Sequence, residues 1–293
     1  MLRNEVQSAF QSPIGLLRAG FSKATHMRTP VICGNWKMHK DTAATASFFE
    51  SFRTLVERSE NCEIVICPSF VNLETAVRAT RGTRIQIGAQ NLCWATEGAF
   101  TGEVSGPMIR ALGCSHVIVG HSERRKYFGE TNESVLEKTV AAIDAGLTPM
   151  VCVGEREKKN AGKALTEQFR YAIAALSNEQ FRRIVIAYEP VWAIGTGETA
   201  TPETAAAAHR LIRGQAKGRF GEEAANNVRI LYGGSVKPDN AKSLMAQPGI
   251  DGLLVGGASL DPVSFGVIVN LRTCQASRTS SVSYAKSSLI ERG

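Results

Sequence analysis

Short apolar runs alternate with amphipathic stretches through the middle of the chain. Runs such as 64–67 and 184–187 are apolar at every position, which is typical of strands buried on both faces of a parallel sheet. The stretches between them place apolar residues at helical spacing, and one begins with the helix-start signal Thr201-Pro202-Glu203. The pattern predicts strands over 31–37, 63–70, 85–91, 116–122, 148–155, 183–190, 228–235 and 251–259, and helices over 44–58, 132–146, 164–176 and 202–216.

Eight such strand–helix units occupy roughly 245 residues, which is the number and the length of a closed (β/α)8 barrel. An open doubly wound sheet is the competing α/β architecture. Its glycine-rich first turn is missing, because Gly195-Thr196-Gly197 lacks the third glycine of that motif. We therefore expect a single barrel domain over 27–275 with disordered, extended termini.

The two ends of the chain differ from the middle. Residues 1–26 contain serine and arginine, few acidic residues and a loosely amphipathic apolar set, without the long apolar core of a secretory signal. Two interpretations stay open for them: an organellar transit peptide, or a segment upstream of a true start at Met27. Residues 276–293 are polar and rich in serine, and we expect them to be disordered. The expected location is the cytoplasm, with an organelle as the alternative.

Composition and charge narrow the class of ligand. The net charge is +7, of which the two ends carry +2 each, so the mildly basic body suits an anionic small molecule. The sequence contains no run of Lys and Arg interleaved with aromatic residues, so binding to nucleic acid is not indicated. It also contains no apolar run that approaches the roughly 18 residues needed to span a bilayer. The seven cysteines form no C-x-x-C pair, and the five histidines lack zinc-site spacing. We expect no metal, no cofactor and a reducing compartment.

Polar residues gather where the predicted strands end, which is where parallel barrels place catalytic groups. Asn35 and Lys37 close the first strand, His121 the fourth and Glu189 the sixth. A lysine, a histidine and a glutamate there suit acid–base chemistry. The alternatives are a surface lysine and a buried histidine without function, whereas Glu189 lies among apolar residues and needs either a partner or a raised pKa. Glu123 is either a surface residue or a partner of Lys37.

Glycines indicate the chemistry of the ligand. Gly233-Gly234-Ser235 and Gly256-Gly257 follow the last two strands, the usual phosphate site of a barrel, and glycine allows backbone N–H groups to approach an anion. Each pair alone is equally consistent with a tight turn. Ala193-Ile194-Gly195-Thr196-Gly197 follows Glu189 and has the composition of a hinged lid.

These residues lie within six motifs that closely resemble triosephosphate isomerase, in that family's order and spacing, over roughly 28–272. They are Gly34-Asn35-Trp36-Lys37-Met38, Gly98-Ala99-Phe100-Thr101-Gly102-Glu103, Val119-Gly120-His121-Ser122-Glu123-Arg124-Arg125, Tyr188-Glu189-Pro190-Val191-Trp192-Ala193-Ile194-Gly195-Thr196-Gly197, Tyr232-Gly233-Gly234-Ser235-Val236 and Val255-Gly256-Gly257-Ala258-Ser259-Leu260.

The resemblance implies a TIM barrel that interconverts dihydroxyacetone phosphate and D-glyceraldehyde 3-phosphate through an enediol(ate), in glycolysis and gluconeogenesis. By carry-over, Glu189 abstracts the proton next to the carbonyl and a neutral His121 polarises the carbonyl oxygen, the pairing for which the family is known. Lys37 and Asn35 supply charge and hydrogen bonds to the substrate.

The resemblance also implies the supporting parts. Glu123 and Cys152 are expected to support the catalytic groups, and the segment around Ala99 and Phe100 to enter the neighbouring subunit of a homodimer. Substrate binding falls to Asn35, Lys37, Gly195, Ser235, Gly234, Gly256 and Gly257, the lid to Pro190, Val191, Trp192, Ala193, Ile194, Gly195, Thr196 and Gly197, and the dimer loop to Thr101, Gly102 and Glu103.

Two positions depart from the family pattern. Met38 stands where many relatives carry cysteine, and Glu198 stands at the far hinge of the lid where lysine is common. A Schiff-base aldolase using Lys37 is the second enzyme hypothesis, and a barrel kept as a scaffold is the third. The aldolase is disfavoured because Lys37 stands beside Asn35 and Trp36 and not in an apolar pocket sequence. The scaffold predicts the loss of Glu189, His121 or Lys37, and none is lost.

Overall fold

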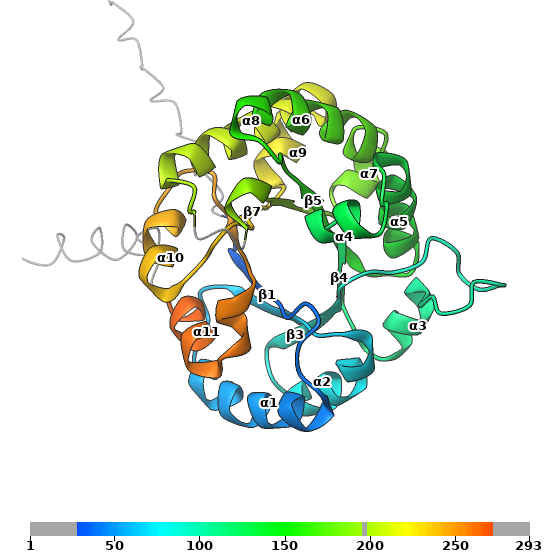
Figure 1. Cartoon of the computed structure of the whole chain (residues 1–293), viewed down its shortest axis with the longest axis vertical. Helices are drawn as coiled ribbons and strands as arrows, with labels where there is room; N and C mark the ends of the chain where they lie inside the picture. Colours follow the sequence, from blue (N-terminus) through cyan, green and yellow to red (C-terminus); the bar gives the residue numbers. More distant parts are fainter. Residues whose placement is uncertain (1–27, 195–197, 272–293) are drawn as a thin grey trace, which may run out of the picture.

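A computed structural model describes residues 28–194 and 198–271, and within them a closed barrel of eight parallel strands is ringed by helices (Figure 1). Each strand pairs with the next along the chain, and β1 closes the barrel against β8. The strands are β1 (Val31–Asn35), β2 (Glu63–Cys67), β3 (Ile85–Ala89), β4 (His116–Val119), β5 (Thr148–Val153), β6 (Val185–Tyr188), β7 (Ile230–Tyr232) and β8 (Gly252–Val255). The expected barrel is confirmed.

All eight strands lie where the apolar runs predict them, but each ends two to four residues earlier than predicted. Most of the residues left over are polar or glycine, and they lie in loops or in the helical segments that follow the strands. Lys37 shows why, since its backbone has φ 53°, in the left-handed region that no strand residue adopts. Because the strands are shorter than predicted, Lys37, His121 and Glu189 lie after the strands, at the mouth of the barrel.

The helices surround the barrel, and most of them bury apolar residues against it. Thr201 caps α8 as its motif predicts, and Gly146, with φ 76°, follows α5. The helices are α1 (Thr42–Val56), α2 (Leu73–Thr80), α3 (Gly106–Ala111), α4 (Ser122–Tyr127), α5 (Asn132–Asp144), α6 (Ala161–Gln168), α7 (Asn178–Phe181), α8 (Pro202–Phe220), α9 (Glu222–Asn227), α10 (Pro238–Met245) and α11 (Pro262–Val269). None of the helices in the described part of the chain is long and apolar enough to cross a membrane.

The apolar core has two layers, because successive strand side chains point to opposite faces. One layer fills the barrel interior and includes Cys33, Met150 and Ala187. The other lies between the strands and the helices and includes Trp36, Phe49 and Phe52. The apolar residues at consecutive strand positions therefore serve both layers.

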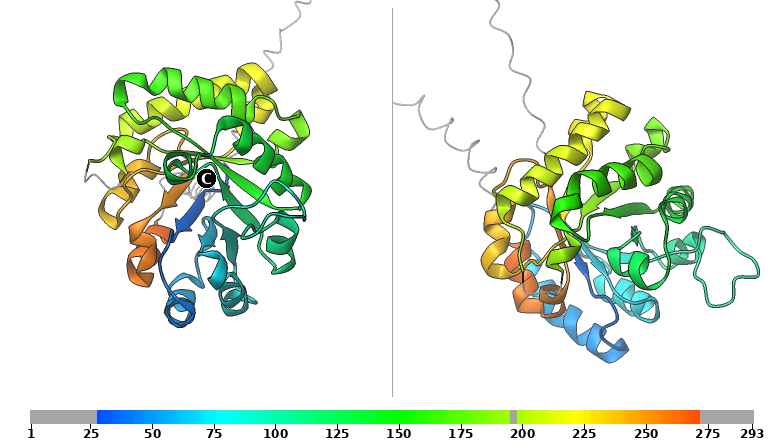
Figure 2. Two further views of the ribbon diagram at one scale, coloured as in Figure 1. Left: turned by 45° about the vertical axis from the view of Figure 1, so that its right-hand side comes forward. Right: turned by 45° about the horizontal axis from the view of Figure 1, so that its top comes forward.

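The loop between β3 and α3 extends away from the barrel, as the right view of Figure 2 and the right side of Figure 1 make visible. At its end, Trp94 and Phe100 meet edge to face with ring centroids 5.7 Å apart, and both remain exposed. An apolar tip held clear of the protein's own core is typical of a contact surface.

Histidine His209 is fully buried in α8 against the ring of Tyr188. Its Nδ1 lies 3.0 Å from the carbonyl oxygen of Gly249, so the neutral ring donates from Nδ1. Burial lowers the pKa of His209 to about 4. The fold therefore holds this histidine neutral.

We expect stability to fall as pH drops from about 6.5, the pKa of an unfolded histidine, towards 4. In that window the unfolded chain binds a proton at His209 and the folded chain does not, so acid favours unfolding by up to about 3 kcal/mol. Denaturant titrations at several pH values measure the slope. His209→Gln should flatten it between pH 6.5 and 4.5, and an unchanged slope in that variant would contradict this assignment.

Candidate active site

Side chains alternate in direction along each strand, and this alternation places two polar side chains at the mouth of the barrel, on the side of its interior. Cys33 and Ala187 face the interior, so Asn35 and Glu189, two residues further along, point the same way. Both are buried, with 5% and 2% of their surface exposed. The sequence therefore places an amide and a carboxylate at the floor of the site.

Lys37 is held in place by its neighbours. Its backbone N–H donates to Oδ1 of Asn35 at 3.0 Å, and Nε2 of Gln90 donates to its carbonyl oxygen at 2.8 Å. These contacts maintain the left-handed backbone at φ 53°, which costs free energy in a non-glycine residue and is common at functional sites. Nζ of Lys37 lies 2.5 Å from Oε1 of Glu123, so the expected pairing of these two residues is present.

His121 caps α4, and this position fixes its tautomer. Its Nδ1 accepts a hydrogen bond from the backbone N–H of Glu123 at 3.2 Å, which requires a lone pair on that nitrogen. The proton of the neutral ring is therefore on Nε2, which lies 2.8 Å from Oε1 of Glu189. A hydrogen-bond donor thus points across the mouth of the barrel.

Glu189 has two partners in this arrangement. Its Oε2 accepts from the backbone N–H of Ser122 at 2.9 Å, while Oε1 faces His121. Burial acts to raise the pKa of Glu189, but the facing His121, the Ser122 amide and Lys37 outweigh it, so the pKa is lowered. Of the two alternatives left open by the sequence, a partner or a raised pKa, the structure has the partner.

The same contact acts on His121. Burial acts to lower its pKa, but the facing Glu189 carboxylate, with Glu123 behind the ring, holds that pKa above its ordinary value. When Glu189 turns away towards another group, the chief cause of the increase is removed. Burial and the hydrogen bond that Nδ1 accepts from the backbone N–H of Glu123 then both favour the neutral ring.

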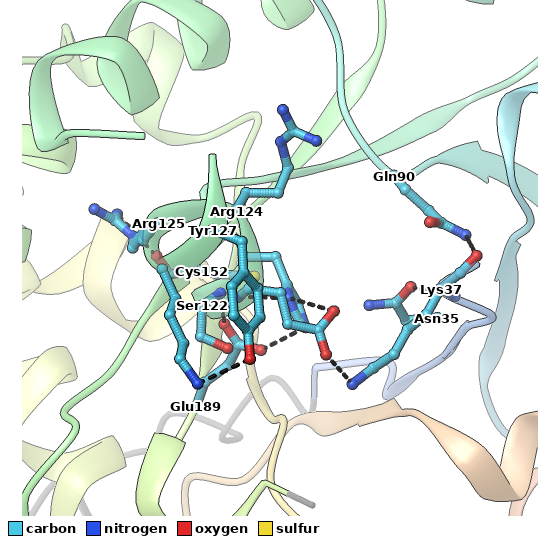
Figure 3. A network of polar contacts seen from close by, with 12 residues as sticks. Asn35, Lys37, Gln90, Ser122, Arg124, Arg125, Tyr127, Cys152 and Glu189 are labelled. Carbon is cyan, nitrogen blue, oxygen red and sulfur yellow. Dashed lines mark hydrogen bonds and ion pairs between the residues drawn. The ribbon is translucent and has the colours of Figure 1, made fainter. Parts of the chain in front are cut away.

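Two cavities meet at this pair. One of about 260 Å³ is lined by Asn35, Lys37 and His121, and another of about 330 Å³ by Glu189 and Cys152. In Figure 3, Asn35 and Lys37 lie on one side and Ser122, Cys152 and Glu189 on the other. Glu189 therefore rests against α4, and its carboxylate must swing towards Lys37 to reach a molecule bound there.

Cys152 lies in β5, fully buried inside the barrel beneath Glu189. Burial and the nearby carboxylate raise the pKa of its thiol well above the ordinary value. A thiol that stays protonated is a packing residue and a poor nucleophile. The supporting role expected for Cys152 stays a prediction.

The two glycine pairs follow β7 and β8 at the mouth of the barrel. A Cβ added at Gly234 would lie 2.2 Å from the hydroxyl oxygen of Tyr232, so only glycine fits there. A Cβ at Gly256 would lie 3.7 Å from Cε of Lys37, whereas Gly257 has open space around it at the start of a 3-10 turn. Ser235 follows the first pair and is half-buried. Of the predicted substrate-binding residues, Asn35 and Gly256 lie beside Lys37. Gly195, Thr196 and Gly197 lie outside the described residues.

The sequence interpretation missed a buried carboxylate next to the predicted lid. Oε1 of Glu155 accepts from the hydroxyl of Tyr188 at 3.0 Å and from Nε1 of Trp192 at 2.7 Å. Burial raises the pKa of Glu155 although these two donors act to lower it. Its only sequence signal is a carboxylate at the end of an apolar strand.

An exposed ion pair lies next to Trp192, close to Glu155. Lys158 contacts Glu198 at 2.8 Å and lies 4.2 Å from the centre of the Trp192 ring. The glutamate at the far hinge thus has a lysine opposite it, supplied by another loop. Within residues 28–194 and 198–271, His, Cys, Asp and Glu side chains do not form groups of three that could hold a metal ion.

Comparisons with known proteins agree on one family. The family model for triosephosphate isomerase matches residues 30–272. A triosephosphate isomerase of Solibacter usitatus is 66% identical over 248 residues, covering 83% of this chain and all of that protein. One from Citrifermentans bemidjiense is 51% identical over 247 residues, covering 83% and 98%. A crystal structure of triosephosphate isomerase from Bartonella henselae superposes with a TM-score of 0.74 at 36% identity, covering 82% of this chain and 97% of that one.

Proposed function

The chain belongs to the triosephosphate isomerase family, and from that membership we propose the role of each residue at the mouth of the barrel. The protein is an isomerase that interconverts dihydroxyacetone phosphate and D-glyceraldehyde 3-phosphate, a reaction of glycolysis and gluconeogenesis. The Schiff-base and scaffold hypotheses are thereby set aside.

The reaction moves one proton between adjacent carbons, so it needs a base that serves both, a donor for the carbonyl oxygen, and a positive charge for the oxyanion. We assign the base to Glu189, which takes the proton as a carboxylate and returns it to the neighbouring carbon. His121 donates its Nε2 proton to the developing oxyanion, and Lys37 with Asn35 stabilises that charge. The glycine pairs with Ser235 are proposed to bind the phosphate.

One observation carries this assignment: Nε2 of a tautomerically fixed His121 lies 2.8 Å from a buried Glu189 carboxylate, beside Lys37. Turnover of glyceraldehyde 3-phosphate by the purified full chain tests it, with dihydroxyacetone phosphate followed as product and a chelator present. Fast turnover under these conditions supports acid–base chemistry by the side chains alone. A folded chain without turnover would contradict the assignment.

The segment Pro190–Gly197 is proposed to be the lid that excludes water, so that the enediolate does not expel phosphate. Support comes from the part of the segment that the structure describes. Nε1 of Trp192 donates to the side chain of Glu155, and the backbone N–H of Val191 donates to the carbonyl oxygen of Glu155 at 2.9 Å. These bonds fix one resting position for the first half of the segment.

We also propose that two copies associate through the extended loop, with Thr101, Gly102 and Glu103 entering the partner. The loop's position clear of its own barrel and its exposed Phe100 and Trp94 support this (Figure 2). The loop begins directly after β3, close in sequence to Gln90, which donates to the carbonyl oxygen of Lys37. Association is therefore proposed to stabilise the Lys37 side of the site.

Replacing Phe100 with aspartate should shift the protein towards monomers and lower its activity. Removing a central aromatic from an interface costs about 2 kcal/mol or more, which is about thirtyfold in the dissociation constant. Sedimentation velocity over a range of concentrations measures the shift. Val263→Asp, an exposed apolar residue on α11, is the matched control. Equal behaviour of the two variants would rule out the loop as the contact.

A cytoplasmic location is proposed for the enzyme. The six cysteines in the described ranges are free and buried, with Cys33 and Cys67 only 3.8 Å apart at sulfur and unbonded, as suits a reducing compartment. The catalytic domain is proposed to span 27–275, which encloses the residues matched by the family model. Residues 1–26 and 276–293 fall outside it and outside the described residues.

A further inference from the structure

Arg125 lies one turn after His121 on α4 and makes three hydrogen bonds with neutral oxygens. Its Nε donates to the carbonyl oxygen of Gly120 at 2.8 Å, Nη1 to Oδ1 of Asn132 at 2.8 Å, and Nη2 to the carbonyl oxygen of Cys152 at 3.2 Å. These acceptors come from the end of β4, the start of α5 and the end of β5. The guanidinium therefore joins three elements at the back of the site.

Two of these contacts bear directly on the catalytic pair. The Gly120 carbonyl belongs to the peptide unit that leads into His121, so the bond from Nε sets the direction in which that residue leaves β4. Gly120 itself has φ 70°, and a Cβ there would lie 3.1 Å from Nη2 of Arg125. Cys152 lies beneath Glu189. The guanidinium of Arg125 thus lies against the backbone of Gly120, which leads directly into His121.

Among the residues that the structure describes, no carboxylate lies within ion-pair distance of Arg125, although Glu189, Glu130 and Glu133 are near enough to act on its charge. Among the ion pairs of the described residues, none involves Arg125, although its neighbours Arg124 and Lys138 share Glu130. Arg125 lines the same 330 Å³ cavity as Glu189, and Figure 3 shows it on the side of Cys152 and Ser122 away from Lys37. Burial lowers the pKa of Arg125, but a guanidinium stays charged at any physiological pH. Its field therefore reaches into the cavity.

We propose that Arg125 is a positioning residue of the isomerase: its fork of donors fixes the Gly120–His121 peptide against the end of β5, and its unpaired charge keeps Glu189 a carboxylate. The second effect matters when Glu189 leaves His121 and Ser122 for the substrate, because it then loses both partners that stabilise its charge at rest. The inference rests on the roles proposed above for His121 and Glu189.

Different substitutions of Arg125 test the positioning half of the proposal, which concerns its hydrogen bonds, and the charge half, which concerns Glu189. A lysine keeps the charge but cannot reach three oxygens in one plane, whereas a methionine loses both. In Arg125→Met we expect kcat to fall by about 10²-fold through misplaced groups, with KM changed little. The acid limb of the kcat profile, which reports the enzyme–substrate complex, should move to higher pH by about one unit, because removing a positive charge raises the pKa of a nearby carboxylate. Arg125→Lys should show the kcat loss without the shift of the acid limb.

Arg219→Met is the matched control, since Arg219 also donates to two backbone carbonyls, at Ala174 and Leu176, but on α8 away from the mouth. It should keep the kcat and the pH profile of the parent. Full activity in Arg125→Lys would overturn the positioning half, and an unmoved acid limb in Arg125→Met would overturn the charge half. If the methionine variant does not fold, the charge half is decided by comparing Arg125→Gln with Arg125→Lys.

A readout independent of turnover completes the test. The ¹⁵N chemical shifts of His121 report which ring nitrogen carries the proton, and we expect the parent to show Nε2–H and the Arg125 variants to show a mixture of forms. An unchanged His121 signal in Arg125→Lys would contradict the positioning role. Should Glu189→Gln prove fully active, the proposed function fails, while the His121 signal still tests the contact.

Discussion

Replacing Glu189 with glutamine is expected to lower kcat by about 10³-fold, the range that a positioned general base contributes. The amide cannot accept the substrate proton, but its oxygen can still accept the Ser122 N–H that Oε2 accepts in the parent. The variant should therefore fold and bind substrate, with KM changed much less than kcat. Steady-state kinetics in both directions, together with thermal unfolding, measure the two effects.

Glu179→Gln provides the control for this change. Glu179 is an exposed carboxylate in the first turn of α7, so its loss removes the same charge without touching the mouth of the barrel. Its turnover should equal that of the parent. A Glu189→Gln enzyme that turns over at the parent's rate would show that another group is the base.

Replacing Lys37 with methionine should lower kcat/KM by about 10³-fold, because the ammonium faces both the anionic substrate and the oxyanion that develops in the transition state. Methionine has a Cβ as lysine does, so the strained backbone at φ 53° is unchanged and the loss reports the charge alone. Glu123 would lose its partner, but it is 38% exposed and remains solvated. Unlike Glu189→Gln, this variant should bind substrate more weakly.

Lys37→Arg separates charge from geometry at this position. Arginine keeps the positive charge near Glu123 but spreads it over a larger planar group, so we expect partial recovery of substrate affinity and little recovery of kcat. Inhibition by inorganic phosphate follows the binding part on its own. Equal phosphate inhibition in the parent and in Lys37→Met would contradict a role for Lys37 in attracting the anion.

Much of the fold could be predicted from the sequence because the barrel repeats one local rule. Apolar runs that are buried on both faces, such as the one over β2, and helix signals such as Thr201 before α8 each act over a few residues. The predicted strand ends were too long since polarity alone does not reveal a left-handed residue such as Lys37.

The site was predictable where residues sit at strand ends, and less so where contacts depend on closure of the barrel. Asn35, Lys37, His121 and Glu189 could be found because the ends of the three strands that carry them must meet at one mouth. The partners of Glu155 lie 33 and 37 residues away along the chain, at Tyr188 and Trp192, and only packing brings them together. Arg125 was within a recognised motif, but its three acceptors could not be deduced from spacing.

The resting position of Glu189 also required the structure. Sequence places a carboxylate among apolar residues, yet the Ser122 amide and His121 that compensate its burial come from α4. The balance of burial against these contacts decides the direction of its pKa, and no local pattern encodes that balance.

The most direct test of the account is turnover of glyceraldehyde 3-phosphate by the purified full chain in D₂O, with carbon 1 of the dihydroxyacetone phosphate product analysed by NMR. Proton transfer by the Glu189 carboxylate predicts fast turnover and a product in which part of the carbon 1 hydrogen is deuterium, since a protonated carboxylate exchanges with solvent. No turnover from the folded chain, or a product without any deuterium, would contradict it.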